Sequence, residues 1–262
     1  MRQQMIDLLP LSFYLCKVRI IKATCLPKAN YGTTARKRNG KFSENLDVEF
    51  NFRTTLYGMS EELYFTTQLM AWYSPDQRPL PWKHIDHPYR IWLSEIILQQ
   101  TRAEQGLPYY EKFVAQYPKV EDLANAPEDE IMKMWEGLGY YSRARNLHAA
   151  AKYVAFELAG VFPKTYTDIL QLKGVGPYTA AAIASFAYNL PHAVVDGNVY
   201  RVLARFFDYP EASDTTAGKK HFAQLAQRLL DKEQPGRYNQ AIMDFGATVC
   251  TPKLAKCENC PL

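Results

Sequence analysis

Apolar residues recur at helical spacing along residues 59–262, and short breaks separate the periodic segments. The segment MSEELYFTTQLMAWY opens this pattern, and Ser60 is the residue expected to cap its helix. Pro88 is expected in the first turn of a second helix, which continues through YRIWLSEIILQQ. Aromatic residues spaced by four in EQGLPYYEKFVAQY predict a third helix.

Further helices are predicted beyond residue 127. The acids after Pro127 favour a helix N-terminus before IMKMWEGL, and Gly137 and Gly139 break that helix. Residues 142–160 predict one long helix closed by glycine. No convincing strand alternation is present, and VFP and HAVVD are interpreted as extended connectors. The pattern predicts an all-α fold of many short helices, with four side chains assigned to the core: Met134, Trp135, Leu147 and Phe156.

Residues 1–58 differ from the rest of the chain. They carry ten Lys and Arg against four Asp and Glu, a net charge of +6. The stretch KANYGTTARKRNGK is basic and has no apolar periodicity, as is typical of a disordered arm. Because Met59 begins a clean amphipathic segment, we also consider that it is the natural start and that residues 1–58 are a misassigned extension.

Composition narrows the classes of protein. Of the 262 residues, 47% are hydrophobic, which is enough for a sizeable core, yet no apolar run approaches the roughly 20 residues that span a bilayer. The N-terminus has no clean apolar core or small-residue cleavage site, so we expect a cytosolic protein. The overall charge is +4, but residues 59–262 carry −2, so any nucleic-acid footprint there must be a local patch.

The sharpest local motif is LKGVGPYTA, residues 172–180. Gly174 and Gly176 flank Val175 and permit a tight turn with positive φ, and Pro177 then starts a helix. Such a turn points backbone N–H groups and a positive helix end at one spot, where a phosphate fits. The motif predicts a helix-hairpin-helix that clamps a DNA backbone, although an ordinary connector between helices has similar glycines.

Two carboxylates stand out in apolar surroundings. Glu95 lies in WLSEIILQQT, where burial of the helix would raise its pKa and suit a general acid; a solvated glutamate would have more polar neighbours. Asp196 closes the apolar run before Gly197 and Asn198, where the simplest interpretation is a helix N-cap. Together, an acid for the leaving group and a carboxylate for the cationic sugar would suit cleavage of a glycosidic bond.

A glycosidic bond inside a duplex is reached by flipping the nucleotide out, and a side chain must then fill the gap. Gln99, Gln100 and Tyr140 are suitable wedges. A metal site is also indicated, because Cys250, Cys257 and Cys260 crowd the C-terminus with the spacing x6 and x2. Zinc and an iron–sulfur cluster both remain open on spacing alone, and a fourth ligand is missing.

As a set, these motifs resemble those of the MutY-type adenine DNA glycosylases in the endonuclease III superfamily. The resemblance runs over nearly all of residues 59–262, and residues 1–58 have no counterpart in it. It is carried by these segments: RPLPW, PYRIWLSEIILQQT, GLGYYSRARNLH, LKGVGPYTAAAIASFA, VVDGNVYRVLAR, YNQAIMDFGATVC and CENCPL.

The resemblance implies excision of adenine mispaired with 8-oxoguanine or guanine in double-stranded DNA. By this resemblance Glu95 matches the acid that protonates adenine N7, and Asp196, beside Asn198, matches the carboxylate that stabilises the oxocarbenium ion. Tyr178 matches a tyrosine of the family's retaining chemistry. The expected DNA-binding residues are Arg78 and Trp82 at the adenine pocket, Gln99, Gln100, Thr101 and Tyr140 at the wedge, and Gly174, Val175 and Gly176 at the hairpin.

The resemblance also implies a two-lobed architecture and a cofactor. A six-helix lobe is expected over 80–193, and a second lobe is expected from 59–79 with 194–262. Cys250, Cys257 and Cys260 match three ligands of a [4Fe-4S] cluster. The family's fourth cysteine follows five residues after the third, beyond Leu262, and its 8-oxoguanine-reading domain is also absent, so a truncated gene or gene prediction is the simplest explanation.

Two other functions are alternatives to adenine excision. A bifunctional glycosylase/lyase needs a lysine amine for a Schiff base, and Tyr178 occupies the position at which that lysine is found in the superfamily. A chain that binds DNA without turnover is the second alternative. We expect a monomer in a bacterial-type cytoplasm, associated with the nucleoid and not with a membrane.

Overall fold

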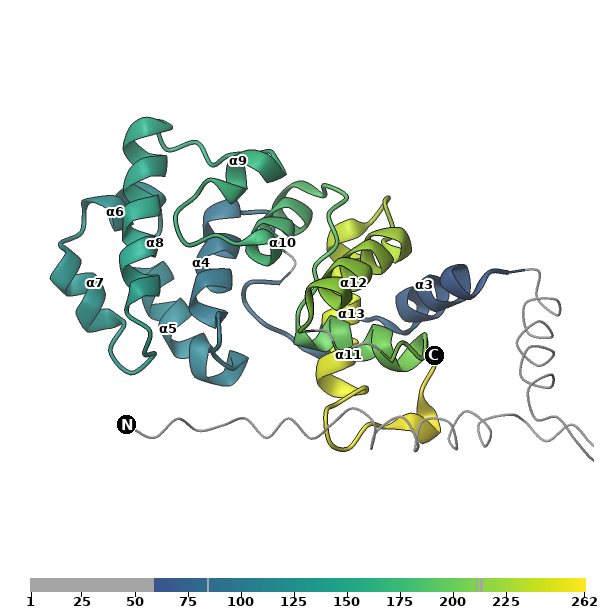
Figure 1. The fold of residues 1–262 in the computed structure, drawn as a ribbon. Coiled ribbons are helices and arrows are strands. Elements are labelled where there is room, and N and C mark those ends of the chain that lie inside the picture. Colours follow the sequence, from purple (N-terminus) through teal and green to yellow (C-terminus); the bar gives the residue numbers. More distant parts are fainter. Residues whose placement is uncertain (1–58, 84, 211, 213) are drawn as a thin grey trace, which may run out of the picture.

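The computed structural model describes residues 59–262 apart from 84, 211 and 213. All regular structure in these residues is helical, which confirms the predicted all-α class. Figure 1 shows two groups of helices joined through a central one. None of the helices in the described part is long and apolar enough to cross a membrane. The predictions for residues 1–58 lie outside the described residues.

The first group surrounds a core in which Trp92, Phe113 and Trp135 are completely buried. A π-helical turn, η2 (Tyr153–Glu157), directly follows α8 (Ser142–Lys152) in this group. The helices of this group are α4 (Pro88–Leu98), α5 (Ala103–Gln116), α6 (Val120–Asn125), α7 (Glu128–Met134), α8 (Ser142–Lys152) and α9 (Tyr166–Leu170).

The second group combines the beginning and the end of the described chain. Helix α3 (Glu61–Trp72) packs against α12 (Thr216–Leu229) and α13 (Pro235–Thr248) (Figure 1). Phe65, Phe222 and Phe245 fill the shared core. The other elements of this group are α11 (Gly197–Phe206), α12 (Thr216–Leu229), α13 (Pro235–Thr248) and the 3-10 turn η3 (Cys257–Asn259). The segment between α3 and α4, with the short turn η1 (Pro75–Gln77), therefore crosses from one group to the other.

Helix α10 (Pro177–Tyr188) belongs to both cores. Ala180 and Ile183 lie in the first core, whereas Ala181 and Ala182 lie in the second. Small side chains let helices on both sides approach closely, and α10 indeed packs on α4 and on α13. The two cores support the expected lobes, 80–193 and 59–79 with 194–262, whose bounds stay a prediction.

Local signals explain where several helices begin. The Ser60 hydroxyl accepts a hydrogen bond from the Leu63 N–H at 3.1 Å, which confirms the expected cap of α3. Pro88 is the first residue of α4, where its missing N–H has no helical partner to lose. Three acids occupy the first turn of α7, as predicted, and there they face the positive end of the helix dipole.

The expected single helix over 142–160 is wrong in its second half. The α-helical hydrogen bonds end at Lys152, and the wider π-turn η2 changes the angular position of the residues after it. Val154 therefore points into the core, while Phe156 is 59% exposed. The prediction that Phe156 is a core residue is wrong for this reason, whereas Trp135 and Leu147 are buried as expected and Met134 is half-buried.

Candidate active site

Glu95 lies on the face of α4 that packs on α10. Only 7% of it is exposed, which confirms the desolvation expected from its apolar neighbours. Burial raises the pKa of Glu95 from 4.5 to about 7, a hydrogen bond from the Tyr178 hydroxyl acts in the lowering direction, and the charge of Asp196 adds to the rise. The carboxyl group is thus substantially protonated near neutral pH and can donate a proton.

Asp196 approaches from the opposite group of helices. It caps α11, and its Oδ1 accepts the Val199 N–H at 2.8 Å, so the N-cap interpretation is correct. Its Oδ2 accepts a hydrogen bond from Asn198 Nδ2, also at 2.8 Å. Arg201 in turn donates to Asn198 Oδ1 at 2.7 Å, which fixes the amide orientation. Asp196 therefore caps α11 with Oδ1, while Asn198 orients its Oδ2.

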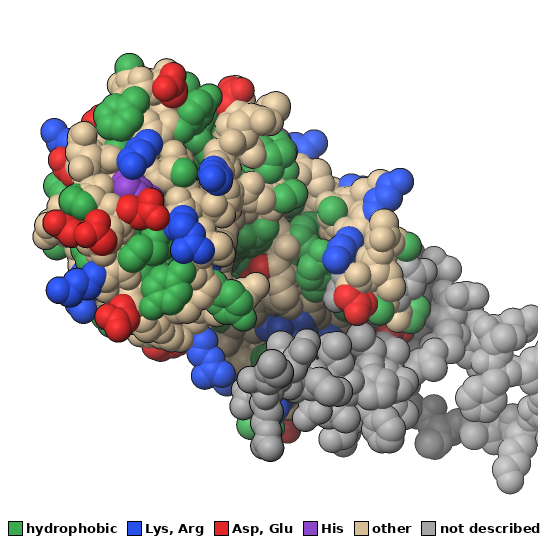
Figure 2. All heavy atoms as spheres, turned by 60° about the vertical axis from the view of Figure 1, so that its left-hand side comes forward, with side chains coloured by type: hydrophobic (Ala, Val, Ile, Leu, Met, Phe, Trp, Pro, Cys, Tyr) green, Lys and Arg blue, Asp and Glu red, His purple; other side chains and the backbone are tan. Residues whose placement is uncertain are grey.

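Tyr178 connects the two carboxylates. It is the second residue of α10, and its hydroxyl is hydrogen-bonded to Glu95 and lies 3.9 Å from Met243 Sδ. Burial, with the charges of Glu95 and Asp196, raises the pKa of Tyr178 well above its usual value of 10. The hydroxyl is therefore neutral, and the three side chains form one electrostatically coupled site. Figure 2 shows the surface hollowed between the two groups of helices, with acidic and apolar side chains inside the hollow.

The hairpin turn lies between α9 and α10, where the sequence predicts it. Gly174 has a φ of +82°, which confirms the left-handed conformation expected there. Gly176 has a φ of −98° and caps α10, so the turn uses a positive φ at the first of these two glycines and an extended backbone at the second. A Cβ at Gly176 would meet no atom within 4 Å, so the space beside this α-carbon is open, whereas the Val175 N–H donates to Leu172 O at 3.0 Å.

The predicted wedge residues lie in two turns, after α4 and before α8. Gln100 and Tyr140 both have positive φ, +55° and +45°, and Tyr140 is 66% exposed. Gln99 is half-buried, unlike the exposed Gln100, and its side chain is already bonded within the protein. Its Nε2 donates to Gly174 O at 3.3 Å and to Thr179 Oγ1 at 3.4 Å. The Thr101 hydroxyl donates to Gln99 O at 3.4 Å and so stabilises the turn.

The two predicted pocket residues lie on the crossing segment between α3 and α4. Trp82 is 7% exposed and packs edge-on against Tyr110, with ring centroids 5.2 Å apart. Arg78 is ion-paired with Asp244 of α13 at 3.2 Å. Asp244 also forms a buried ion pair with Lys83, whose ammonium donates to Arg78 O at 3.1 Å. The segment is thereby attached to the second group of helices.

Comparison with known proteins places this geometry in a family. Residues 93–229, which include all the catalytic candidates, match the model of the HhH-GPD superfamily base excision DNA repair proteins. The chain belongs to this family. Among curated relatives, the adenine DNA glycosylases of Mus musculus and Homo sapiens are 42% and 41% identical over 76% and 78% of the chain. One from Buchnera aphidicola subsp. Baizongia pistaciae is 38% identical over 76% of the chain.

Solved structures agree with the HhH-GPD assignment. A thermostable thymine-DNA glycosylase superposes with a TM-score of 0.70 at 33% identity, covering 76% of this chain and 92% of that one. A trapped endonuclease III–DNA covalent intermediate gives 0.66 at 21% identity, covering 78% and 94%, and supports the fold alone. The chain spans 40%, 39% and 57% of the mouse, human and Buchnera relatives, respectively.

The three cysteines follow α13. All are half-buried; Cys260 N–H donates to Cys257 O at 3.3 Å, and Cys250 O accepts from Arg201 Nε at 2.7 Å. Thiolates are the ligands that iron–sulfur clusters use. However, three donors are one short of a [4Fe-4S] set, and no three potential ligands are gathered for a metal ion within the described residues. The side chains fit the cluster in chemistry but do not complete its site.

Two important groups were missed by the sequence reasoning. Arg143 is 8% exposed, and it donates to the carbonyl of Ile97, beside the turn of Gln100, and to the carbonyl of Leu138, beside the turn of Tyr140. Its segment SRARNLH is typical of a solvated basic helix end, so the sequence gives no signal of this burial. The ion pair of Lys83 with Asp244 joins residues 161 positions apart, which no local pattern could reveal.

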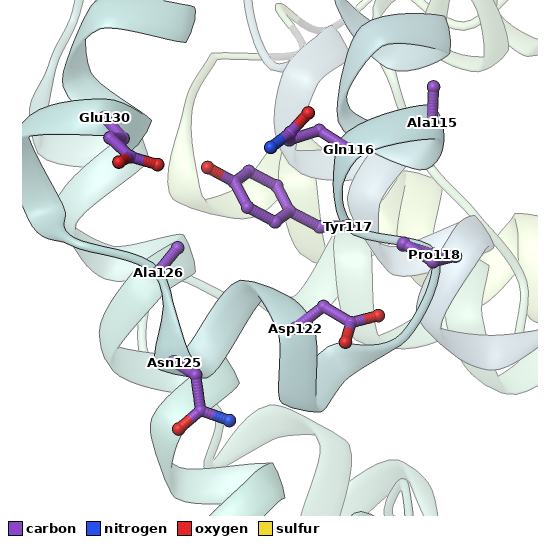
Figure 3. Close-up of a pocket in the computed structure, with 8 residues that line it drawn as sticks. All are labelled: Ala115, Gln116, Tyr117, Pro118, Asp122, Asn125, Ala126 and Glu130. Carbon is purple, nitrogen blue, oxygen red and sulfur yellow. The ribbon is translucent and has the colours of Figure 1, made fainter.

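A separate surface pocket of about 570 Å³ opens beside α5, α6 and α7. Figure 3 shows Tyr117 between Gln116 and Glu130 in this pocket, with Asp122 and Asn125 on α6. None of the residues that line it is a predicted site residue. The pocket is therefore distinct from the candidate active site.

Proposed function

We propose that this HhH-GPD protein is an adenine DNA glycosylase that hydrolyses the glycosidic bond of adenine opposite 8-oxoguanine or guanine. The observation that carries the proposal is the convergence of Glu95, Tyr178 and Asp196 on one site, with a Glu95 pKa of about 7. A carboxyl group with that pKa is a proton donor at neutral pH, and Asp196 supplies a negative charge nearby. The sequence identity of 42% and 41% to adenine DNA glycosylases supports adenine as the base that is released.

In the proposed reaction, protonated Glu95 donates its proton to N7 of adenine. The bond between the sugar C1′ and the base nitrogen then breaks, and its electron pair leaves with the base. The Asp196 carboxylate stabilises the positive charge on the sugar. Water finally attacks C1′ and its proton passes to the Glu95 carboxylate, which restores the acid and gives free adenine and an abasic site. Tyr178 offers no amine, so no Schiff base forms and the DNA strand is not cut by elimination.

The proposed DNA contacts follow from the positions of the surrounding turns. The turn of Gly174, Val175 and Gly176 brings a backbone phosphate to the N-terminus of α10, where the Val175 N–H is held by Leu172 O and the N–H groups of the first helical turn bind the phosphate. Gln100 and Tyr140 fill the space that the flipped nucleotide leaves. Gln99 and Thr101 support the turn after α4, which carries Gln100. Arg78 and Trp82 border the adenine pocket. The partner is double-stranded DNA bearing the mispair, bound by a monomer in the cytoplasm.

We also propose that Cys250, Cys257 and Cys260 supply three ligands of a [4Fe-4S] cluster. The chemistry of the three thiols supports this assignment. When bound, such a cluster would tie the segment after α13 to the end of that helix. Iron and sulfide analysis of freshly purified protein tests the proposal. Protein that folds fully and contains no iron contradicts it.

The base that is released decides between the candidate functions. Purified chain is incubated with otherwise identical duplexes containing 8-oxoguanine:adenine, guanine:adenine or guanine:thymine, and free bases are separated by chromatography. We expect adenine from the first two duplexes and none from a normal thymine:adenine pair. Release of thymine alone favours the activity named for the structural relative. Borohydride trapping of a covalent adduct favours a lyase, and tight binding without release favours a binding-only chain.

A further inference from the structure

The two turns that carry Gln100 and Tyr140 are strained. Each residue is held with positive φ, a backbone conformation that is unfavourable for a residue other than glycine and persists only where the surroundings enforce it. Both side chains are exposed, so packing of the side chains themselves does not supply the restraint. A group elsewhere must therefore hold the backbone at these two places.

The guanidinium of Arg143 is that group for the turn after α4. This helix ends at Leu98, and its last carbonyl groups have no partners within the helix. Nη1 of Arg143 donates to Ile97 O at 2.9 Å and to Gln99 O, directly before the strained Gln100. It also lies 3.3 Å from Thr101 Oγ1, beyond the strained residue. The nitrogen thus contacts the turn on both sides of Gln100.

The other arm of the same guanidinium holds the turn before α8. Nη2 donates to Leu138 O at 3.0 Å and to Gly139 O at 3.3 Å, directly before the strained Tyr140. The Tyr140 ring lies 5.8 Å from the guanidinium carbon, within cation–π range. On the far side, Trp135 Nε1 donates to Gly139 O at 3.0 Å. One planar group therefore connects two turns that are about 40 residues apart in sequence.

The charge of Arg143 has an unusual environment. Only 8% of the residue is exposed, and none of the ion pairs among the described residues includes it. The acceptors of its hydrogen bonds are carbonyl oxygens and a hydroxyl, not a carboxylate. This position therefore depends on the two-armed, planar shape of the guanidinium and not on pairing with an acid. A lysine could keep the charge, but its single ammonium cannot reach both turns in a planar fork.

We propose that Arg143 is a positioning residue that locks the turns of Gln100 and Tyr140 into one rigid ridge, which separates the base pair that contains the adenine. Gln99 extends the ridge to the hairpin by donating to Gly174 O, so the wedge and the phosphate contact share a fixed spacing. This inference rests on the proposed action on duplex DNA. It adds that opening of the duplex, and not the chemistry at Glu95, depends on Arg143.

The test measures base unstacking directly. A duplex with 8-oxoguanine:adenine carries the fluorescent base 2-aminopurine next to the mispair, and the intact chain is added in excess. Wild-type protein is expected to raise the fluorescence. Arg143→Lys should lower that rise, and the single-turnover rate of adenine release, about tenfold or more, because small misplacements of positioning groups have effects of this size. On an adenine that is already unstacked opposite an abasic site, the loss should be much smaller.

Two controls and one further variant separate positioning from stability. Arg228→Lys makes the same chemical change on the exposed surface of α12 and should leave both signals unchanged. Val154→Ala weakens the same core without touching the ridge, so at a matched fall in Tm it should retain unstacking. Trp135→Phe removes the N–H that holds Gly139 O and should reduce unstacking in the same direction as Arg143→Lys.

The outcomes distinguish the inference from the function on which it rests. If wild-type protein neither unstacks the probe nor releases adenine, the proposed function fails. If wild-type protein does both and Arg143→Lys does so equally well, the positioning role is wrong. The role is also wrong if Arg143→Lys loses activity equally on paired and unstacked adenine, or only to the extent that Val154→Ala does.

Discussion

At the scale of single residues, Glu95 occupies a position where its ionised form is disfavoured. The same burial that makes it a proton donor at neutral pH also costs stability when the proton is lost. The unfolded chain ionises this carboxyl group near pH 4.5, whereas the folded chain keeps the proton until about pH 7. Between these values the unfolded state binds fewer protons, so the free energy of unfolding falls as pH rises.

Glu95→Gln should therefore become more stable than wild type as pH increases. The difference in free energy of unfolding between variant and wild type should grow by about 2–3 kcal/mol from pH 5 to pH 8, since one pKa unit corresponds to about 1.4 kcal/mol. Urea denaturation of both proteins at the two pH values measures this change. A difference that stays constant over this range would show that Glu95 ionises normally.

The sequence predicted those site residues whose surroundings are formed by positions close to them in the chain. The apolar neighbours of Glu95 lie on its own helix, and the cap formed by Asp196 involves Val199, three residues away. Arg143 could not be predicted, because its acceptors come from turns that only the tertiary fold brings together. The convergence of Glu95 with Asp196 was implied by the family resemblance and not by any pattern in the intervening residues.

At the scale of elements, the hairpin turn uses its two glycines differently. Gly174 has a left-handed backbone, and a Cβ there would lie 2.8 Å from Asn146 Cβ. Gly176 is extended and has open space around its missing Cβ. The sequence indicated a glycine turn correctly but could not tell which glycine needs the unusual φ. That choice depends on the path of the chain into α10.

Alanine substitutions should separate these two roles. Gly174→Ala should lower the free energy of unfolding by about 1–3 kcal/mol, because it adds strain in the left-handed region and crowds Asn146. Gly176→Ala should leave stability within about 0.5 kcal/mol of wild type but weaken duplex binding, since the methyl group occupies the space that a phosphate would use. Thermal unfolding and fluorescence-anisotropy titration measure the two effects. Equal effects of both substitutions on stability would contradict this division.

Helix α8 shows where a periodic pattern is insufficient. Its apolar positions predict a continuous helix to Gly160, but the π-turn η2 inserts after Lys152 and moves Phe156 to the surface. Periodicity assumes a constant angle per residue, so one wide turn changes the face of every later side chain. The existence of the helix was therefore predictable, and the orientation of its last residues was not.

At the scale of the whole molecule, the candidate active site lies where two cores meet. Helix α10 belongs to both cores, and the segment before α4 is tied to α13 by Lys83 and Asp244. Both side chains of that pair are only 3% exposed. Burial lowers the pKa of Lys83, and its hydrogen bond to Asp244 acts in the opposite direction. The pair thus joins the two halves between which Glu95 and Asp196 face each other.

Removing one partner of this pair should destabilise the whole fold. Asp244→Asn leaves the Lys83 ammonium buried without an opposite charge, and such losses cost about 3–5 kcal/mol. The double substitution Lys83→Met with Asp244→Leu should cost much less than Asp244→Asn alone, because no charge stays buried. Urea unfolding of the three proteins measures both values. A loss below about 1 kcal/mol for Asp244→Asn would mean that the pair is not a structural tie.

In the proposed reaction, the release of adenine depends on Glu95 as the proton donor. The most direct measurement is single-turnover release of free adenine from an 8-oxoguanine:adenine duplex by wild type, Glu95→Gln and the control Glu157→Gln, whose side chain is exposed on η2. We predict release by wild type and the control, and a fall of at least about 10²-fold in Glu95→Gln, as loss of a general acid implies. Full adenine release by folded Glu95→Gln would contradict the account.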